Sequence, residues 1–589
     1  MHPRNSINAA DDARLPRSWK QNRAVFVLCG LMLVLHAAIA FDCARRMTVT
    51  HDEYWHLPVG VLNLQSGRFD QDNLNPPLVR VWAAIPVLLA GAKPAATDPS
   101  LDATGHGDAF LRANPRQYHR LFFYGRLMIV LLSVATGLVL GIWSWEWFGG
   151  RAACLTVLLW SLSPTVLASA SLVTTDLGAA LCSVVTLYTL AKQAEQPSWR
   201  RAVLFGICLG LAQLAKYTSL LLYPLSILLW FVLRIGRRGD NTGTLRTTAM
   251  QWLVALILSG IVLNAGYLFR GSFADLRRYH FQSEALAGLT AHLEGLQNCP
   301  VPLPKDYLEG LDRQRHIMES AHPVFLDGQW NTTGFPHYYL MALWYKLPHA
   351  LQGLVLLAGF YVIWPGREPR LPRRQIFLLL PFGTLLLIGS LSGMQLGLRY
   401  ILPALPFLIL FAGQVARWLN GRQYLCRSAV VTLIAASAFL PLRHHPHHLA
   451  FFNLLAGGPE KGMVHLLDSN IDWGQDLRLL REYVEEHKIR QLGLAYFGTV
   501  PPDSLGIAYE APPAAVPAPG WYAVSVNFVM GRPHTIRLPF GGFRPVGLDE
   551  FGYFRFFEPH ARIGYSINVY HLSADDIRDW QAARRRYLR

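Results

Sequence analysis

Long apolar runs alternate with short charged segments along most of this chain. Runs of about 17–25 mainly apolar residues are long enough to cross a bilayer as helices. The run at 76–91 carries Arg80 and Pro86, so we expect it to lie in or near the membrane interface. About eleven other runs predict membrane-spanning helices: 24–42, 123–147, 152–170, 174–191, 201–215, 217–233, 249–269, 347–364, 375–391, 397–416 and 427–442.

Basic residues are distributed unevenly between the segments that connect these runs. Alternate segments are rich in lysine and arginine, whereas the short turns on the opposite side carry only Lys216 and Arg399. Because positively charged loops stay in the cytoplasm, we predict a cytoplasmic N-terminus. Long segments at about 43–122, 270–346 and after 443 then lie on the outer side. The two runs that flank Lys216 could instead form a re-entrant turn.

The segment after residue 443 is long enough to fold as a small domain. The stretch "DLRLLREYVEEHK" (476–488) has helical periodicity, and "LGLAYFG", "WYAVSVNFV" and "YSINVYHL" are typical of strands. We therefore expect a polytopic α-helical membrane protein with a C-terminal extracytoplasmic α/β domain. Its expected parts are a cytoplasmic segment 1–23, a transmembrane domain 24–442 with large outer loops 43–122 and 270–346, and an outer domain 443–589.

Composition agrees with a membrane protein. The 589 residues are 52% hydrophobic and only 16% charged. The net charge of +16 would suit nucleic acid, but its distribution follows the membrane topology, so we expect no nucleic-acid partner. The seven cysteines show no metal-binding spacing. Cys43 and Cys299 fall outside the apolar runs and could pair, although two unrelated thiols are the favoured interpretation.

Acidic residues mark the predicted outer face. The stretch "THDEYWH" (50–56) places Asp52 and Glu53 directly after the first apolar run, and the topology brings Asp176 to the same face. Adjacent acids raise each other's pKa, which favours one of them as a base near neutral pH. The pair could also be solvated loop acids, and Asp176 could cap a helix. We favour a catalytic pair, because the aromatic residues that follow it suggest partial burial.

Basic residues occur on the same predicted face. Lys216 and Arg399 are each alone in their turns, Arg80 lies in the interfacial run, and Lys346 precedes the eighth run. Such cations suit a phosphate at headgroup depth, although each side chain could simply reach for water, which we favour for Lys346. With the carboxylates, they indicate sugar transfer from a polyprenyl phosphate. No P-loop or Gly-rich dinucleotide motif occurs, so no nucleotide is expected.

The order of these motifs resembles the GT-C glycosyltransferases of glycosyltransferase family 39. That family includes the protein O-mannosyltransferases and the bacterial aminoarabinose transferases that modify lipid A. The similar stretches are the acidic pair followed by "NPPL", then "SP…TTD", "GLAQLAKYTSL", "WYKLP" and "RYILPALP". Together they extend in order over about residues 24–442.

The resemblance implies an inverting transfer of one sugar from a polyprenyl-phosphate donor to an acceptor hydroxyl, on the outer face of a bacterial inner membrane. Asp52 would be the base, and Glu53 would orient a substrate or, with Asp52, hold a divalent cation. Asp176 would line the same cavity. The acceptor would be a lipid, a polysaccharide or a protein. By the same resemblance Lys216 and Arg399 would hold the donor phosphate. From the residue pattern we also expect Arg80 to contribute to the phosphate site, and His56, Tyr54, Lys346 and Trp473 to bind substrate.

The tail "LLDSNIDWGQDL" (466–477) differs from that of the characterised transferases. Asp468, Asp472 and Asp476 recur every four residues, which does not fit an EF-hand calcium loop. We expect Asp472 to cap a helix at 474–488 instead. The run "RHHPHH" (443–448) could bind a metal ion, but at the start of an outer domain we favour a polar interfacial linker.

Two other functions remain open. A transporter or flippase would share the apolar spans, but it should place ionisable groups near the bilayer midplane on broken helices. An assembly protein would bind its partners through the outer domain and would not need the acidic pair. The clustering of charge at the outer boundary favours the transferase.

Overall fold

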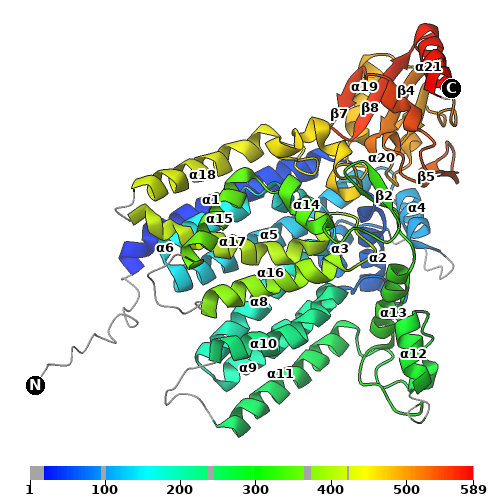
Figure 1. Cartoon of the computed structure of the whole chain (residues 1–589). Coiled ribbons are helices and arrows are strands. Elements are labelled where there is room, and N and C mark those ends of the chain that lie inside the picture. Colours follow the sequence, from blue (N-terminus) through cyan, green and yellow to red (C-terminus); the bar gives the residue numbers. More distant parts are fainter. Residues whose placement is uncertain are drawn as a thin grey trace, which may run out of the picture.

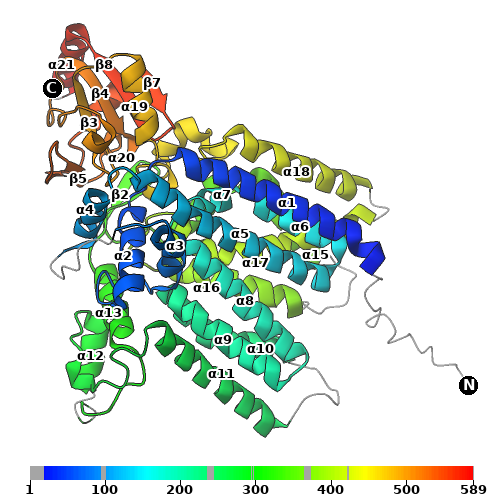
Figure 2. The ribbon, with the colours of Figure 1, turned by 180° about the vertical axis from the view of Figure 1, so that it is seen from behind.

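A bundle of long helices carries a mixed α/β region at one end (Figure 1). The computed structural model describes residues 19–93, 101–234, 244–292, 295, 297–363, 373–420 and 424–587. Helices α1 (Trp19–Arg46) and α18 (Tyr424–Arg443) both extend along the bundle toward the C-terminal region (Figure 2). The end of α1, which leads to Asp52, and the end of α18, which leads to the C-terminal region, therefore lie at the same end of the bundle.

Among the residues that the structure describes, six helical segments are long and apolar enough to cross a membrane, so the chain is a helical membrane protein. They are Arg23–Arg46, Tyr118–Phe148, Asp176–Glu195, Tyr217–Arg234, Leu245–Gly266 and Leu398–Leu419. A seventh span results if α6 (Gly150–Ser161) and α7 (Pro164–Ala170) count as one, since they meet at a bend of 61°.

All eleven expected apolar runs are helical, but several do not reach the length and apolarity of these six. These are α9 (Trp199–Ala215), α15 (His349–Ile363), α16 (Arg373–Ser390) and α18. Pro164 explains one break, because it starts a new helix where the run was expected to continue. The run after Lys216 begins as a 3-10 helix, η1 (Tyr217–Leu221), and continues as α10 (Leu222–Arg234).

The two long loops form a layer at the end of the bundle that faces the C-terminal region (Figures 1 and 2). The expected interfacial run is the helix α3 (Leu78–Leu89). It packs closely on α2 (Glu53–Ser66), because Gly60 has no side chain and its backbone meets the Arg80 carbonyl. The other elements of this layer are α4 (Ala103–Ala113), α12 (Glu284–His292), α13 (Lys305–Glu319), β1 (Val324–Leu326), β2 (Gln329–Asn331) and α14 (Tyr338–Lys346).

The C-terminal region contains a four-stranded sheet in the order β3-β4-β8-β7. Strand β3 (Leu492–Ala495) is parallel to β4 (Gly520–Ser525), and β8 (Ile567–Leu572) is antiparallel to β4 and to β7 (Ala561–Ile563). The mixed α/β character expected from the sequence is confirmed. The remaining elements are α19 (Leu477–Glu486), α20 (Val526–Val529), β5 (His534–Arg537), β6 (Phe543–Val546), and α21 (Ala574–Tyr587).

One expected strand is shorter than the sequence suggested. The stretch "WYAVSVNFV" leaves the sheet after Ser525 and turns into the short helix α20. The Ser525 hydroxyl accepts a hydrogen bond from the Asn527 backbone N–H, so it caps this helix.

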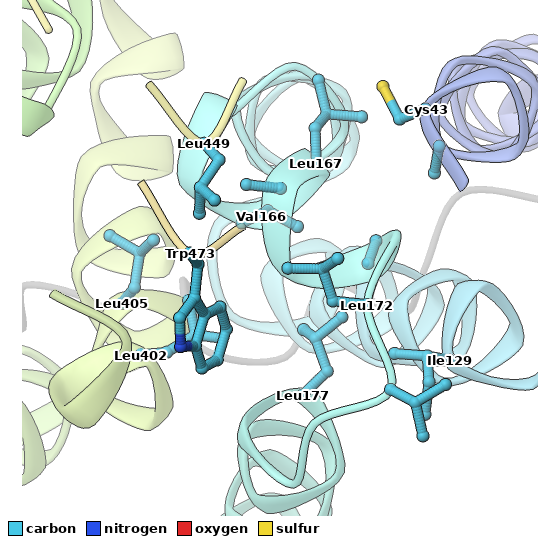
Figure 3. Packing of buried hydrophobic residues seen from close by; sticks show 14 of the residues in the cluster. Cys43, Ile129, Val166, Leu167, Leu172, Leu177, Leu402, Leu405, Leu449 and Trp473 are labelled. Atoms are coloured by element: carbon cyan, nitrogen blue, oxygen red, sulfur yellow. The ribbon is translucent and has the colours of Figure 1, made fainter. Parts of the chain in front are cut away.

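The bundle and the C-terminal region share one buried hydrophobic cluster. Trp473 belongs to it, and Figure 3 shows this side chain beside Leu402 of the bundle, near Leu405 and Leu177. A shared core fixes the position of the C-terminal region relative to the helices. Residues from both parts can therefore build one rigid site at their junction.

Candidate active site

The segment that carries the acidic pair is held between the bundle and the C-terminal region. After α1 ends at Arg46, the backbone N–H groups of Thr48 and His51 donate to the carbonyls of Gln475 and Trp473, both at 2.9 Å. Asp52 then directly precedes α2. The C-terminal region thus sets the position of the backbone at Asp52.

Glu53 is completely buried and holds this segment in place through hydrogen bonds to its neighbours. Its two carboxylate oxygens accept hydrogen bonds from Arg126 at 2.8 and 2.7 Å and from the Thr50 hydroxyl and backbone N–H at 2.9 Å. The Val173 N–H adds another at 2.7 Å. These bonds occupy the carboxylate, and Glu53 does not line the cavity described below. Glu53 was expected to orient a substrate or to hold a divalent cation. The structure instead pairs its carboxylate with the buried Arg126.

A cavity of about 540 Å³ lies at the junction of bundle and C-terminal region. Asp52 faces it from the start of α2, and Asp176 from the start of α8 (Asp176–Glu195). Lys216 faces it from the position directly before η1, and Arg399 faces it from the 3-10 helix η4 (Leu398–Ala404). Six of the ten expected site residues therefore line this cavity: Asp52, His56, Asp176, Lys216, Arg399 and Trp473.

The charged groups of the cavity form a chain of alternating sign. The Asp52 carboxylate accepts a hydrogen bond from the Arg399 guanidinium at 2.8 Å. The same Arg399 nitrogen lies 3.9 Å from the Asp176 carboxylate, which accepts a 2.5 Å bond from the Lys216 ammonium. The guanidinium also lies 4.0 Å from the centre of the Trp473 ring. Two cations are thus fixed beside two carboxylates, which suits a phosphate and a base in one space.

Asp52 is ionised at neutral pH. Burial by itself raises the pKa of its carboxyl group, but the charge of the adjacent Arg399 guanidinium outweighs burial and holds the pKa below its usual range. The expectation that two adjacent acids raise each other's pKa does not hold for Asp52, because Glu53 is neutralised by Arg126 and Arg399 contacts Asp52 directly.

Aromatic and imidazole rings form another wall of the cavity. The His51 ring meets Trp55 edge-on at 5.1 Å and stacks on Phe497 at 5.7 Å. Burial lowers the pKa of His51 and of His56, so both rings are uncharged at neutral pH. His56 Nδ1 has no hydrogen-bond partner among the described residues and is available to a substrate hydroxyl. Neutral rings of this kind suit an uncharged sugar.

Three residues of the C-terminal region also line the cavity and were not among the expected site residues. Asp468 and Arg532 form an ion pair at 2.6 Å, and His534 lies 5.5 Å from the His51 ring. Asp468 had a sequence signal in the repeat of acids every four residues. No sequence pattern marks Arg532 or His534. Only the folding of the C-terminal region brings the start of β5 and the residues just before it to the cavity.

The other two acids of that repeat have separate partners. The carboxylate of Asp472 accepts bonds from the Ser525 hydroxyl and from the Gly474 N–H, the latter at 2.9 Å. Asp476 accepts from the Ser566 hydroxyl at 2.7 Å. Asp472 does not cap α19, which begins later than expected, at Leu477.

Arg80, Tyr54 and Lys346 were also expected in the site but lie outside the cavity. Arg80 is buried and donates to the carbonyl oxygens of Asp72 and Asn75 at 2.9 and 2.7 Å, so it supports the loop whose Asn75 lines the cavity. The hydroxyl of Tyr54 donates to Asp108. Each side chain is bound within its own loop layer.

Lys346 is also outside the cavity and does not reach for water. It is buried and donates to the carbonyl oxygens of Leu449 and Asn470 at 2.8 and 2.5 Å. These bonds tie α14 to the segment that leads into the C-terminal region. Burial lowers the pKa of this amine well below its usual range.

Comparison with known proteins gives one family match. Residues 119–266 match the family model described as dolichyl-phosphate-mannose-protein mannosyltransferase, so the resemblance expected from the sequence is confirmed over this segment. No curated protein matches the chain.

Two solved structures are similar over most of the chain. ArnT from Cupriavidus metallidurans bound to undecaprenyl phosphate aligns with 12% identity and a TM-score of 0.45, over 93% of this chain and 98% of that one. The apo state of the same protein aligns with 14% identity and a TM-score of 0.31, with the same coverage.

Proposed function

We propose that this chain, whose residues 119–266 match the dolichyl-phosphate-mannose-protein mannosyltransferase family, is an inverting membrane glycosyltransferase. It would move one sugar from a polyprenyl-phosphate donor to an acceptor hydroxyl. The observation that carries the proposal is the cavity in which an ionised Asp52 lies beside Arg399, Asp176 and Lys216. This combination serves a reaction that removes a proton from a hydroxyl and releases a phosphate.

The reaction is a single displacement at the anomeric carbon. The acceptor oxygen attacks this carbon while Asp52 takes the hydroxyl proton. The bond between the carbon and the phosphate oxygen breaks, and its electron pair stays on the departing phosphate. Arg399 and Lys216 stabilise that charge, which is the main electrostatic task of the site. One displacement inverts the configuration of the sugar.

The proposal includes a location for the reaction. With alternate connecting segments rich in lysine and arginine, the chain would cross a bacterial inner membrane with a cytoplasmic N-terminus. The apolar helices would then make up to eleven crossings within residues 24–442. The cavity and the α/β region after residue 443 would face the extracytoplasmic side, where lipid-linked donors replace nucleotide sugars.

The test is transfer of label from radiolabelled polyprenyl-phosphate sugars by the purified protein in cell-envelope extract. Asp52→Asn keeps the size of the side chain but removes the base, so we expect turnover to fall by about 10²–10⁴-fold. Asp503→Asn, an exposed acid of the C-terminal region, is the control and should act as wild type. The fraction that gains label identifies the acceptor as lipid, polysaccharide or protein.

Full turnover by folded Asp52→Asn would exclude Asp52 as the base. If the folded wild-type protein turned over none of the donors, the transferase proposal would be rejected in favour of the transporter alternative. Transbilayer movement of the same labelled lipids in vesicles would then be the next measurement.

A further inference from the structure

A second cluster of chemically reactive side chains lies where α1 meets the linker after α18. It consists of Cys43, His445 and His448, and we refer to it as the junction cluster. The sulfur and the nearest nitrogen atoms of its three members all lie within 4.8 Å of one another. Cys43 and His448 are buried and His445 is half-buried, so an ion could enter past His445. The proposed transfer reaction uses none of these residues.

The two distances from His445 Nδ1 to the other ligand atoms match those between ligands of one tetrahedral ion. His445 Nδ1 lies 3.6 Å from Cys43 Sγ and 3.3 Å from His448 Nε2. With Zn–N bonds of about 2.05 Å and Zn–S bonds of about 2.3 Å, tetrahedral angles place two nitrogens roughly 3.3 Å apart and a nitrogen and a sulfur roughly 3.6 Å apart. His445 Nδ1 is therefore spaced from both other ligand atoms as in a tetrahedral site, and the third pair lies within 4.8 Å.

The surroundings of the cluster orient its ligands. The other nitrogen of the His445 ring, Nε2, lies 2.8 Å from a carboxylate oxygen of Asp42. Such a carboxylate holds the proton on Nε2 and leaves the Nδ1 lone pair free toward Cys43 and His448, as in carboxylate–histidine–zinc sites. Asp42 is itself held by Arg46 at 2.6 Å.

His448 provides an independent indication. Its ring is 1% exposed, and its Nδ1 atom has no hydrogen-bond partner among the described residues. Hydrogen bonding alone thus leaves this buried ring only partly satisfied, at a cost in free energy. The other ring nitrogen, Nε2, lies 3.3 Å from His445 Nδ1 and so faces into the junction cluster.

We propose that Cys43, His445 and His448 bind one zinc ion. On binding, the Cys43 thiol loses its proton to solvent and coordinates as the thiolate, and water completes the tetrahedron. The ion joins the outer end of α1 to the linker that begins the C-terminal region. Because the chain from Cys43 continues directly to Asp52, the ion also fixes one end of the segment that carries this carboxylate.

The test measures zinc in the purified full-length protein, with any polyhistidine tag removed. After dialysis against micromolar free zinc, we expect about one ion per chain in the wild type. Cys43→Ser and His448→Gln should lose it, whereas His444→Gln should retain it. His444 is a matched control, since it belongs to the same histidine run but packs on Phe451 rather than in the cluster. Asp42→Asn should keep the site but weaken its affinity about 10–100-fold.

A spectroscopic measurement on the wild type covers the case in which a variant fails to fold. Replacement of zinc by Co²⁺ should give a thiolate-to-cobalt charge-transfer band that saturates at one ion per chain. Zinc that is retained equally by folded Cys43→Ser and His448→Gln would overturn the proposal. So would a folded wild-type protein that binds no zinc or shows no such band.

Discussion

Asp52 and Glu53 are neighbours in the sequence with opposite surroundings. Asp52 faces the cavity and Arg399, whereas Glu53 is completely buried against Arg126. The sequence predicted an acidic pair at the outer edge of the first helix, but not that the two carboxylates would separate. Their partners lie 347 and 73 residues away, and only tertiary packing selects them.

The pH dependence of stability should reveal a different carboxyl group, that of Asp472. Burial raises its pKa from 3.8 to about 7. Between about pH 4 and pH 7 the folded protein therefore holds a proton that the unfolded chain has released, so stability falls as the pH rises through this window. Asp472→Asn should remove this loss and stabilise the protein at pH 8 by on the order of 1–3 kcal/mol relative to wild type.

Thermal unfolding of both proteins at pH 4 and pH 8 checks this expectation. At pH 4, close to the pKa of 3.8 in the unfolded chain, the two states differ less in bound protons than at about pH 6, and most of the loss has not yet accumulated. The advantage of the variant should therefore largely disappear. An Asp472→Asn protein that is less stable than wild type at pH 8 would show that the charged carboxylate is the stabilising form.

Among the elements, α2 is held in place by an ion pair at its first residue and by a close backbone contact at its middle. Glu53 at its first residue binds Arg126 of α5 (Tyr118–Phe148), and Gly60 in its middle allows close contact with α3. Local apolar pattern predicted the helices themselves, including α3 and α5. It could not predict which charges would be structural, since Glu53, Arg80 and Lys346 are of the same types as the residues in the cavity.

Glu53→Gln should therefore destabilise the protein, because it leaves the buried Arg126 guanidinium without a counter-charge. The expected loss is about 3–5 kcal/mol. Asp70→Asn is the matched control, since Asp70 pairs with Arg68 on the surface and such pairs contribute about 0–1 kcal/mol. Chemical or thermal unfolding in detergent measures both. Equal stability of the two variants would contradict a structural role for Glu53.

In the molecule as a whole, the cavity belongs to neither part alone. Its walls come from segments that extend from His51 to His534. The topology expected from the apolar pattern already brought Asp52, Asp176, Lys216 and Arg399 to one face. The wall supplied by the C-terminal region was beyond sequence reasoning, because it depends on how that region packs on the helices.

The shared core predicts that the bundle and the C-terminal region unfold together. Trp473→Ala removes a large buried side chain at their junction and should cost about 3–5 kcal/mol. A single transition at lower temperature should then be seen by probes in either part. Trp521→Ala, on β4 and only partly buried, is the control. Separate transitions for the two parts would show that the junction does not couple them.

The contact between Arg399 and Asp52 has a consequence for the order of events in the proposed reaction. One nitrogen of Arg399 holds Asp52, and a donor phosphate would claim the same nitrogen. Arrival of the phosphate therefore weakens the attraction that keeps Asp52 a poor proton acceptor, and its basicity rises. In the proposed reaction the lipid donor would thus increase the basicity of the carboxylate that its own transfer requires. A water molecule that arrived before the donor would meet a carboxylate still held by Arg399.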